Sequence, residues 1–103
     1  MLTHHVFFWL HNSGSAEDRR KLMEGVQGLA AIPTVRALHA GTPAPTEQRE
    51  VVDSSWDVCE LMHFDSAEDQ QVYQDHPLHR RFIQEYGHLW RKVIVYDSVS
   101  GNP

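Results

Sequence analysis

The chain has 103 residues, of which 41% are hydrophobic and 22% charged, and its formal net charge at pH 7 is -5. This length predicts one domain, residues 1–103, with a core that needs neither disulfides nor metal ions. The acidic balance and the lack of a Lys/Arg cluster exclude the usual nucleic-acid-binding pattern. A single cysteine, with no apolar run long enough to span a bilayer, predicts a cytoplasmic protein with no membrane partner.

Residues 3–10 predict a strand that is apolar on both faces. Successive strand side chains point to opposite faces. One face therefore carries His5, Phe7 and Trp9, and the other carries His4, Val6, Phe8 and Leu10. Each face therefore needs a cover. A second short apolar run, residues 93–96, predicts another strand near the C-terminus.

The tetrapeptide Ser-Ala-Glu-Asp occurs twice, at residues 15–18 and 66–69. A serine N-cap followed by acidic residues is typical of a helix start, so each copy predicts one. The first helix covers residues 16–31 and ends before Pro33. Gly25 and Gly28 weaken this helix, and the space beside Gly25 suits either a ligand or a closely packed neighbour.

The middle of the chain predicts two further strands and an interrupted helix. Residues 35–40 form one strand, and residues 56–64, apolar on both sides, form a strand with a central place in the sheet. A proline-containing loop connects them. The second helical region begins at Ser66, breaks at His76 and restarts at Pro77, because proline is tolerated in the first turn of a helix.

The order β-α-β-β-α-β predicts an α+β, ferredoxin-like fold with an antiparallel sheet and both helices on one face. Leaving about six large side chains bare on the other face would forgo roughly 10 kcal/mol. That is comparable to the entire stability of a domain, about 5–15 kcal/mol. We therefore expect a homodimer in which two sheets face each other and close into a barrel.

Several segments together resemble the stress-responsive A/B barrel (Dabb, dimeric α+β barrel) family. The segments are residues 4–10, the Ile32-Pro33-x-Val35 helix exit, Phe64-Asp65-Ser66, Tyr73-x-x-His76-Pro77-x-His79 and residues 93–97. The likeness extends over residues 2–99. It implies a ferredoxin-like fold and a barrel-forming homodimer, but no single activity, since members of this family differ in function.

Polyketide cyclases in that family close their substrate by an intramolecular aldol condensation. By resemblance, their catalytic residues correspond to His5, Tyr73 and His79. A histidine with a near-neutral pKa can take a proton from a carbon acidified by carbonyls, while a second group donates to the developing enolate. The chain departs from the cyclase pattern at Gly25, where those enzymes have a pocket tyrosine.

We expect an apolar cavity between sheet and helices that takes a small apolar or aromatic ligand. The residues expected to line it are His5, Phe7, Trp9, Tyr73, His79, Ile83 and Trp90. Three functions remain open: a ligand-binding domain, a cofactor-independent cyclase or related acid-base enzyme, and a structural interaction module. No cofactor and no metal are expected, because phosphate-binding loops, nicotinamide fingerprints and complete metal-ligand motifs are missing.

Overall fold

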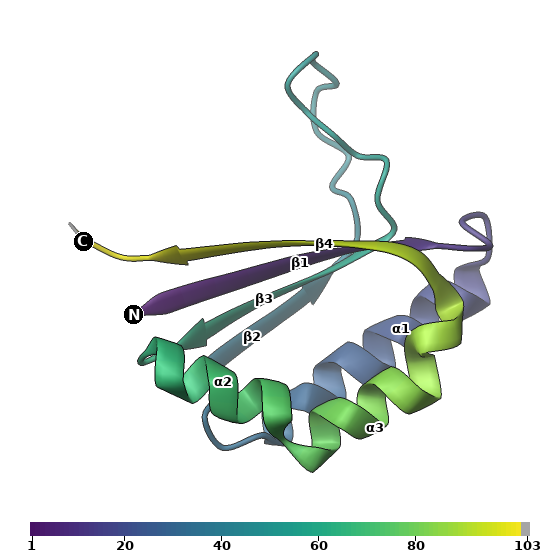
Figure 1. Ribbon diagram of the computed structural model, residues 1–103. Coiled ribbons are helices and arrows are strands. Elements are labelled where there is room, and N and C mark those ends of the chain that lie inside the picture. Colours follow the sequence, from purple (N-terminus) through teal and green to yellow (C-terminus); the bar gives the residue numbers. More distant parts are fainter. Residues whose placement is uncertain (102–103) are drawn as a thin grey trace.

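Residues 1–101 are described by a computed structural model in which four antiparallel strands form one sheet and the helices lie on one of its faces (Figure 1). The elements are β1 (Leu2–Leu10), α1 (Ala16–Gly28), η1 (Leu29–Ala31), β2 (Ala37–Gly41), β3 (Val58–Phe64), α2 (Ala67–Asp75), α3 (Pro77–Tyr86), η2 (Gly87–Leu89) and β4 (Trp90–Val99). The predicted α+β, ferredoxin-like class is confirmed. Within these residues no helix has the length and hydropathy needed to cross a membrane.

Side-chain caps begin the helices at the predicted places. The hydroxyl oxygens of Ser15 and Ser66 each accept a hydrogen bond from the backbone N–H three residues later, at 3.1 Å. The break between α2 and α3 has its own cap, because Nδ1 of His76 accepts from the backbone N–H of Leu78 at 3.1 Å. Pro77 then occupies the first turn of α3.

The strand order is β2-β3-β1-β4, so β3 has the central place that its sequence predicted. In β1 the even-numbered side chains, such as His4 and Phe8, point toward the helices and are buried. The odd-numbered side chains point to the opposite side, which we call the open face. The apolar core thus lies between the helices and the even-numbered side of β1, joined by Val58, Met62 and Phe64 of β3.

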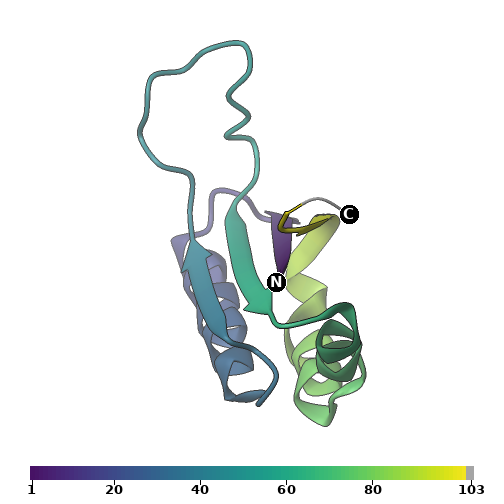
Figure 2. The ribbon, with the colours of Figure 1, turned by 90° about the vertical axis from the view of Figure 1, so that its left-hand side faces the viewer.

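A long loop, residues 42–56, stands up from the open face, away from the helices (Figures 1 and 2). We call it the arm. Its base is fixed to the sheet, since the indole N–H of Trp9 in β1 donates to Ser55 Oγ at 3.1 Å. Within the arm, the indole N–H of Trp56 donates to the carbonyl of Asp53 at 2.8 Å. The arm thereby helps cover one end of the open face, where Trp9 is only 6% exposed.

The space beside Gly25 is filled by a neighbouring side chain. A Cβ at Gly25 would lie 2.8 Å from ring carbons of Tyr86 on α3, whereas a Cβ at Gly28 would meet nothing within 4 Å. Of the two expectations for Gly25, close packing is therefore the one observed. The glycine lets α1 approach the aromatic ring of α3.

This pair of glycines gives a matched stability test within one helix. We expect Gly25→Ala to lower the free energy of unfolding by about 1–3 kcal/mol, because the added methyl group overpacks against Tyr86. Gly28→Ala should raise it by up to about 1 kcal/mol through helix propensity. Urea unfolding measures both changes. Equal effects of the two substitutions would contradict the packing argument, and Tyr86→Leu should reduce the cost of Gly25→Ala.

Candidate functional site

A cavity of about 340 Å³ lies between the sheet and helices α2 and α3. Its apolar wall includes Val6 and Phe8 of β1, Phe82 and Ile83 of α3, and Trp90 at the start of β4. Its polar groups are His4, Glu60, Tyr73, Gln74 and His79. An apolar wall with a few converging polar groups is the usual composition of a small-molecule site.

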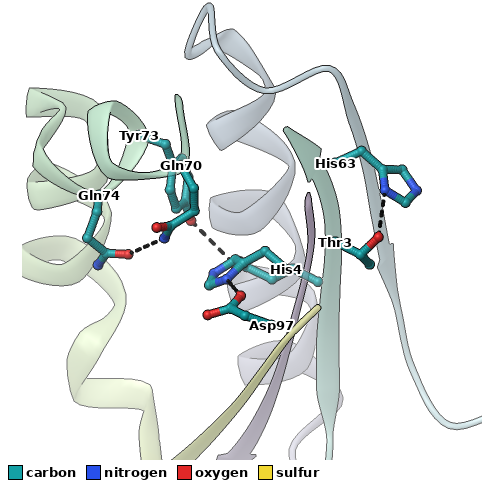
Figure 3. Close-up of polar contacts among 8 residues, drawn as sticks. Thr3, His4, His63, Gln70, Tyr73, Gln74 and Asp97 are labelled. Atoms are coloured by element: carbon teal, nitrogen blue, oxygen red, sulfur yellow. Dashed lines mark hydrogen bonds and ion pairs between the residues drawn. The ribbon is translucent and has the colours of Figure 1, made fainter. Parts of the chain in front are cut away.

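His4 connects the cavity to a carboxylate on the neighbouring strand. The register of β1 and β4 sets His4 opposite Asp97, and Nδ1 of His4 lies 2.5 Å from Oδ1 of Asp97 (Figure 3). When that nitrogen donates to the carboxylate, the tautomer of His4 is set and Nε2 is directed to the other side of the ring. There Nε2 lies 3.9 Å from Oε1 of Glu60.

Glu60 is buried in the cavity wall, with 2% of its surface exposed. The hydroxyl of Tyr73 donates to its Oε1 at 3.2 Å, but its Oε2 has no hydrogen-bond partner among the described residues. Burial raises the pKa of Glu60 to about 7, and the hydrogen bond from Tyr73 opposes this rise. The carboxyl group can therefore gain or lose a proton near neutral pH.

Tyr73 lies at the centre of the polar groups. Its ring centroid is 4.8 Å from that of His79 and 5.9 Å from that of His4. Burial, followed by the proximity of Glu60, raises the pKa of Tyr73, so its hydroxyl stays protonated and acts as a donor. Burial, with a smaller contribution from His4, lowers the pKa of His79 and favours its neutral form. The site thus combines a proton donor with neutral imidazole.

Four of the seven predicted site residues line this cavity: Tyr73, His79, Ile83 and Trp90. His5, Phe7 and Trp9 do not, so the prediction that they line it is wrong. They lie on the open face, where the His5 ring is 4.2 Å from that of Phe7. The reason is that a strand with two apolar faces carries no signal for which face meets the helices, and a shift of one residue exchanges them. His4 takes the place expected for His5.

Phe7 and Trp9 instead line a smaller hollow of about 140 Å³ on the open face, together with Asp53, Trp56, Ile94 and Tyr96. Cys59 also lies on this side of β3 and is buried, as its apolar strand predicted. Among residues 1–101 no group of three or more His, Cys, Asp or Glu side chains is positioned to hold a metal ion.

Glu60 and Asp97 belong to the site but were not among the residues predicted from the sequence. Glu60 did leave a signal, because it is a single carboxylate in phase with the apolar residues Val58 and Met62 on the buried side of β3. Burying a carboxylate without partners costs free energy, so a carboxylate on the buried side of a strand is a candidate functional residue. Asp97 left no comparable signal, since its partnership with His4 depends on the register between the first and last strands.

Comparisons with known proteins agree with this architecture. A family model described as the stress responsive A/B barrel domain matches residues 2–100. No curated protein matches the chain. A solved protein from Arabidopsis thaliana has a TM-score of 0.80 and 21% identity, with 100% of this chain and 98% of that chain covered.

Two further solved structures extend the comparison. A dimeric ferredoxin-like protein of unknown function from Thermobifida fusca has a TM-score of 0.75 and 17% identity, covering 94% of this chain and 88% of that one. A hydroxynitrile lyase from Passiflora edulis has a TM-score of 0.78 and 18% identity, with coverage of 99% and 96%. Others are also described as dimeric. These likenesses show a shared fold, while the family model matches nearly the whole chain. This chain belongs to the stress-responsive A/B barrel (Dabb) domain family.

Proposed function

We propose that the cavity binds a small, largely apolar molecule that carries a hydroxyl group. The observation that carries this proposal is Glu60 Oε2, a buried acceptor in the cavity wall with no hydrogen-bond partner among the described residues. Such an atom costs about 1–3 kcal/mol, which a donor on a ligand would recover. A volume of about 340 Å³ lies within the range of small-molecule sites.

Titration calorimetry with 4-propylphenol and propylbenzene tests this proposal. The phenol should bind at least about 10-fold more tightly, because only its hydroxyl can donate to Glu60. Ile83→Trp should block the cavity, since Ile83 lines it and is 45% exposed. Val72→Trp is the matched control, because Val72 is similarly exposed on α2 but lies outside the cavity lining. Equal binding of both compounds, unchanged by Ile83→Trp, would contradict the proposal.

The proposed assembly is a homodimer in which two copies meet through the open face. That face presents half-buried Phe7, Leu61 and Ile94, and Tyr96 is 64% exposed beside them. Contiguous aromatic and aliphatic side chains of this kind are typical of protein interfaces. The arm rises from the same side and would flank a second copy (Figure 2). The proteins of the same fold that are described as dimeric support a dimer, and the exposed apolar side chains favour the open face as its interface.

A second candidate function is general acid-base catalysis on a carbonyl compound bound in the cavity. The observation that favours it is the chain of contacts from Asp97 through His4 to Glu60. A histidine oriented by a carboxylate is a suitable base for a proton next to a carbonyl group, and the Tyr73 hydroxyl can donate to the enolate oxygen. An aldol cyclisation of a polyketide needs such proton transfers. The Passiflora edulis lyase supports the compatibility of this fold with enzyme activity.

The third function left open by the sequence, a purely structural module, has less support. A structural core would fill the space between sheet and helices with side chains. The cavity and the unpartnered oxygen of Glu60 instead favour a site that takes a ligand.

A further inference from the structure

We infer that the dimer dissociates when three histidines of the open face take up protons. This inference rests on the proposed dimer through that face. The residues are His5 of β1, His39 of β2 and His63 of β3, three of the eight histidines of the chain. All three side chains point away from the helices, because they lie in phase with Phe7 and Leu61 in the ladder.

The three imidazoles are distributed across neighbouring strands. His5 and His39 flank Leu61 from either side, because both pair with it in the register. The ring of His39 leans over Gly41, where an added Cβ would be 2.7 Å from Nε2. One row away, Nδ1 of His63 is 3.1 Å from the hydroxyl of Thr3, on the opposite side of the sheet from His4 (Figure 3).

Few other ionisable groups share the open face, and among the described strand residues none of them is a carboxylate. They are Cys59 of β3 and Lys92 and Tyr96 of β4. Burial raises the pKa of Cys59, which keeps its thiol neutral. The arm carries three acidic residues, Glu47, Glu50 and Asp53, and Asp53 lies at the end of the face occupied by Lys92. None of the ion pairs among the described residues involves His5, His39 or His63, so protonation of these histidines adds positive charge that no carboxylate partner offsets.

A second copy would make this charge more unfavourable. Facing sheets pack about 10 Å apart, so a two-fold dimer encloses three imidazoles from each copy in a layer with little water. Burial and like charges both favour the neutral form of histidine. This tendency is already present in the single chain, where burial, then His39 and His4, lower the pKa of His5. The dimer therefore requires neutral histidines and weakens as pH falls.

The expected size of the effect follows from linkage. If dimerisation lowers the pKa of one imidazole in each copy by one unit from an ordinary value of about 6.5, the dimer dissociation constant rises about 50-fold between pH 7.5 and 5.0. Sedimentation equilibrium at matched ionic strength measures the dimer dissociation constant at the two pH values. Circular dichroism at pH 5.0 establishes that the chain remains folded.

Matched variants identify the responsible groups. The triple variant His5→Gln, His39→Gln, His63→Gln should dimerise at both pH values with less than about a fivefold change, because glutamine does not titrate. The control is His11→Gln, His88→Gln, two exposed histidines outside the strands, which should respond like the parent chain. The exposed position of His39 makes the single variant His39→Gln a second test, and it should reduce the pH effect without a change in fold.

Each outcome has one meaning. If the parent chain dimerises equally tightly at both pH values, this inference is overturned but the proposed dimer is supported. A native monomer at pH 7.5 overturns the dimer itself. The inference is also overturned if the pH effect disappears in the double control variant but persists in His39→Gln and in the triple variant. Other histidines would then be responsible for the response.

Discussion

Replacing His4 with alanine should lower the rate of proton exchange at a carbon acid bound in the cavity by about 10²–10⁴-fold. The physical reason is that His4 is the cavity imidazole with a carboxylate partner, Asp97, at 2.5 Å. Its removal leaves no base in that orientation. A suitable probe is 2-tetralone, an apolar ketone with an acidified methylene group. Incorporation of deuterium from D2O, followed by NMR, measures the rate.

The neighbouring residue provides the control. His5→Ala removes an imidazole one residue away, but His5 lies on the open face and not in the cavity lining. Its exchange rate should stay within about twofold of the parent rate, because the variant keeps all the acid-base groups of the cavity. A loss of exchange in His5→Ala with retention in His4→Ala would reverse the assignment. Equal, uncatalysed rates in the parent and both variants would leave the cavity as a binding site without this chemistry.

Replacing Glu60 with glutamine should make the protein more stable at alkaline pH by about 3 kcal/mol. In the folded chain burial raises the pKa of Glu60 from 4.5 to about 7. The folded state therefore binds the proton more tightly than the unfolded state does. The associated stability is fully present below pH 4.5 and is lost as pH rises through 7. Glutamine is neutral throughout and avoids this loss.

Urea unfolding of the two proteins at pH 4.5 and 8, each pair at one protein concentration, measures the effect. The difference between Glu60→Gln and the parent should be small at pH 4.5 and largest at pH 8. Glu47→Gln is the control, because Glu47 is exposed in the arm and its substitution should change stability by less than about 0.5 kcal/mol at either pH. Destabilisation by Glu60→Gln at pH 8 would mean that the fold favours the ionised carboxylate, contrary to the effect of its burial.

The two functional proposals predict different patterns in these experiments. Binding of 4-propylphenol requires the acceptor at Glu60 and an open cavity, whereas proton exchange also requires His4. A chain that binds the phenol but does not exchange 2-tetralone protons is a binding protein. Tyr73 and His79 remain predicted participants in catalysis, since their position beside Glu60 and His4 suits donation and acceptance of a proton.

Local signals in the sequence determined the elements and their order. The serines before α1 and α2, the proline after His76 and the apolar runs act through neighbouring residues, and these features appear where they were predicted. The central place of β3 also followed from the chain, because a strand that is apolar on both sides is stable only between neighbours. These local patterns were sufficient to predict the fold class and to predict that the helices cover only one face of the sheet.

Only the tertiary structure decided which face of β1 meets the helices. His4 and His5 are adjacent and chemically identical, and the apolar residues that follow them are equivalent on both sides, so alternation alone cannot distinguish the faces. The choice depends on register and on which side packs with Phe64 and Tyr73. The same long-range pairing brings Asp97 to His4 and places Glu60 beside Tyr73. The site therefore depends on contacts between distant segments, which local sequence preferences do not encode.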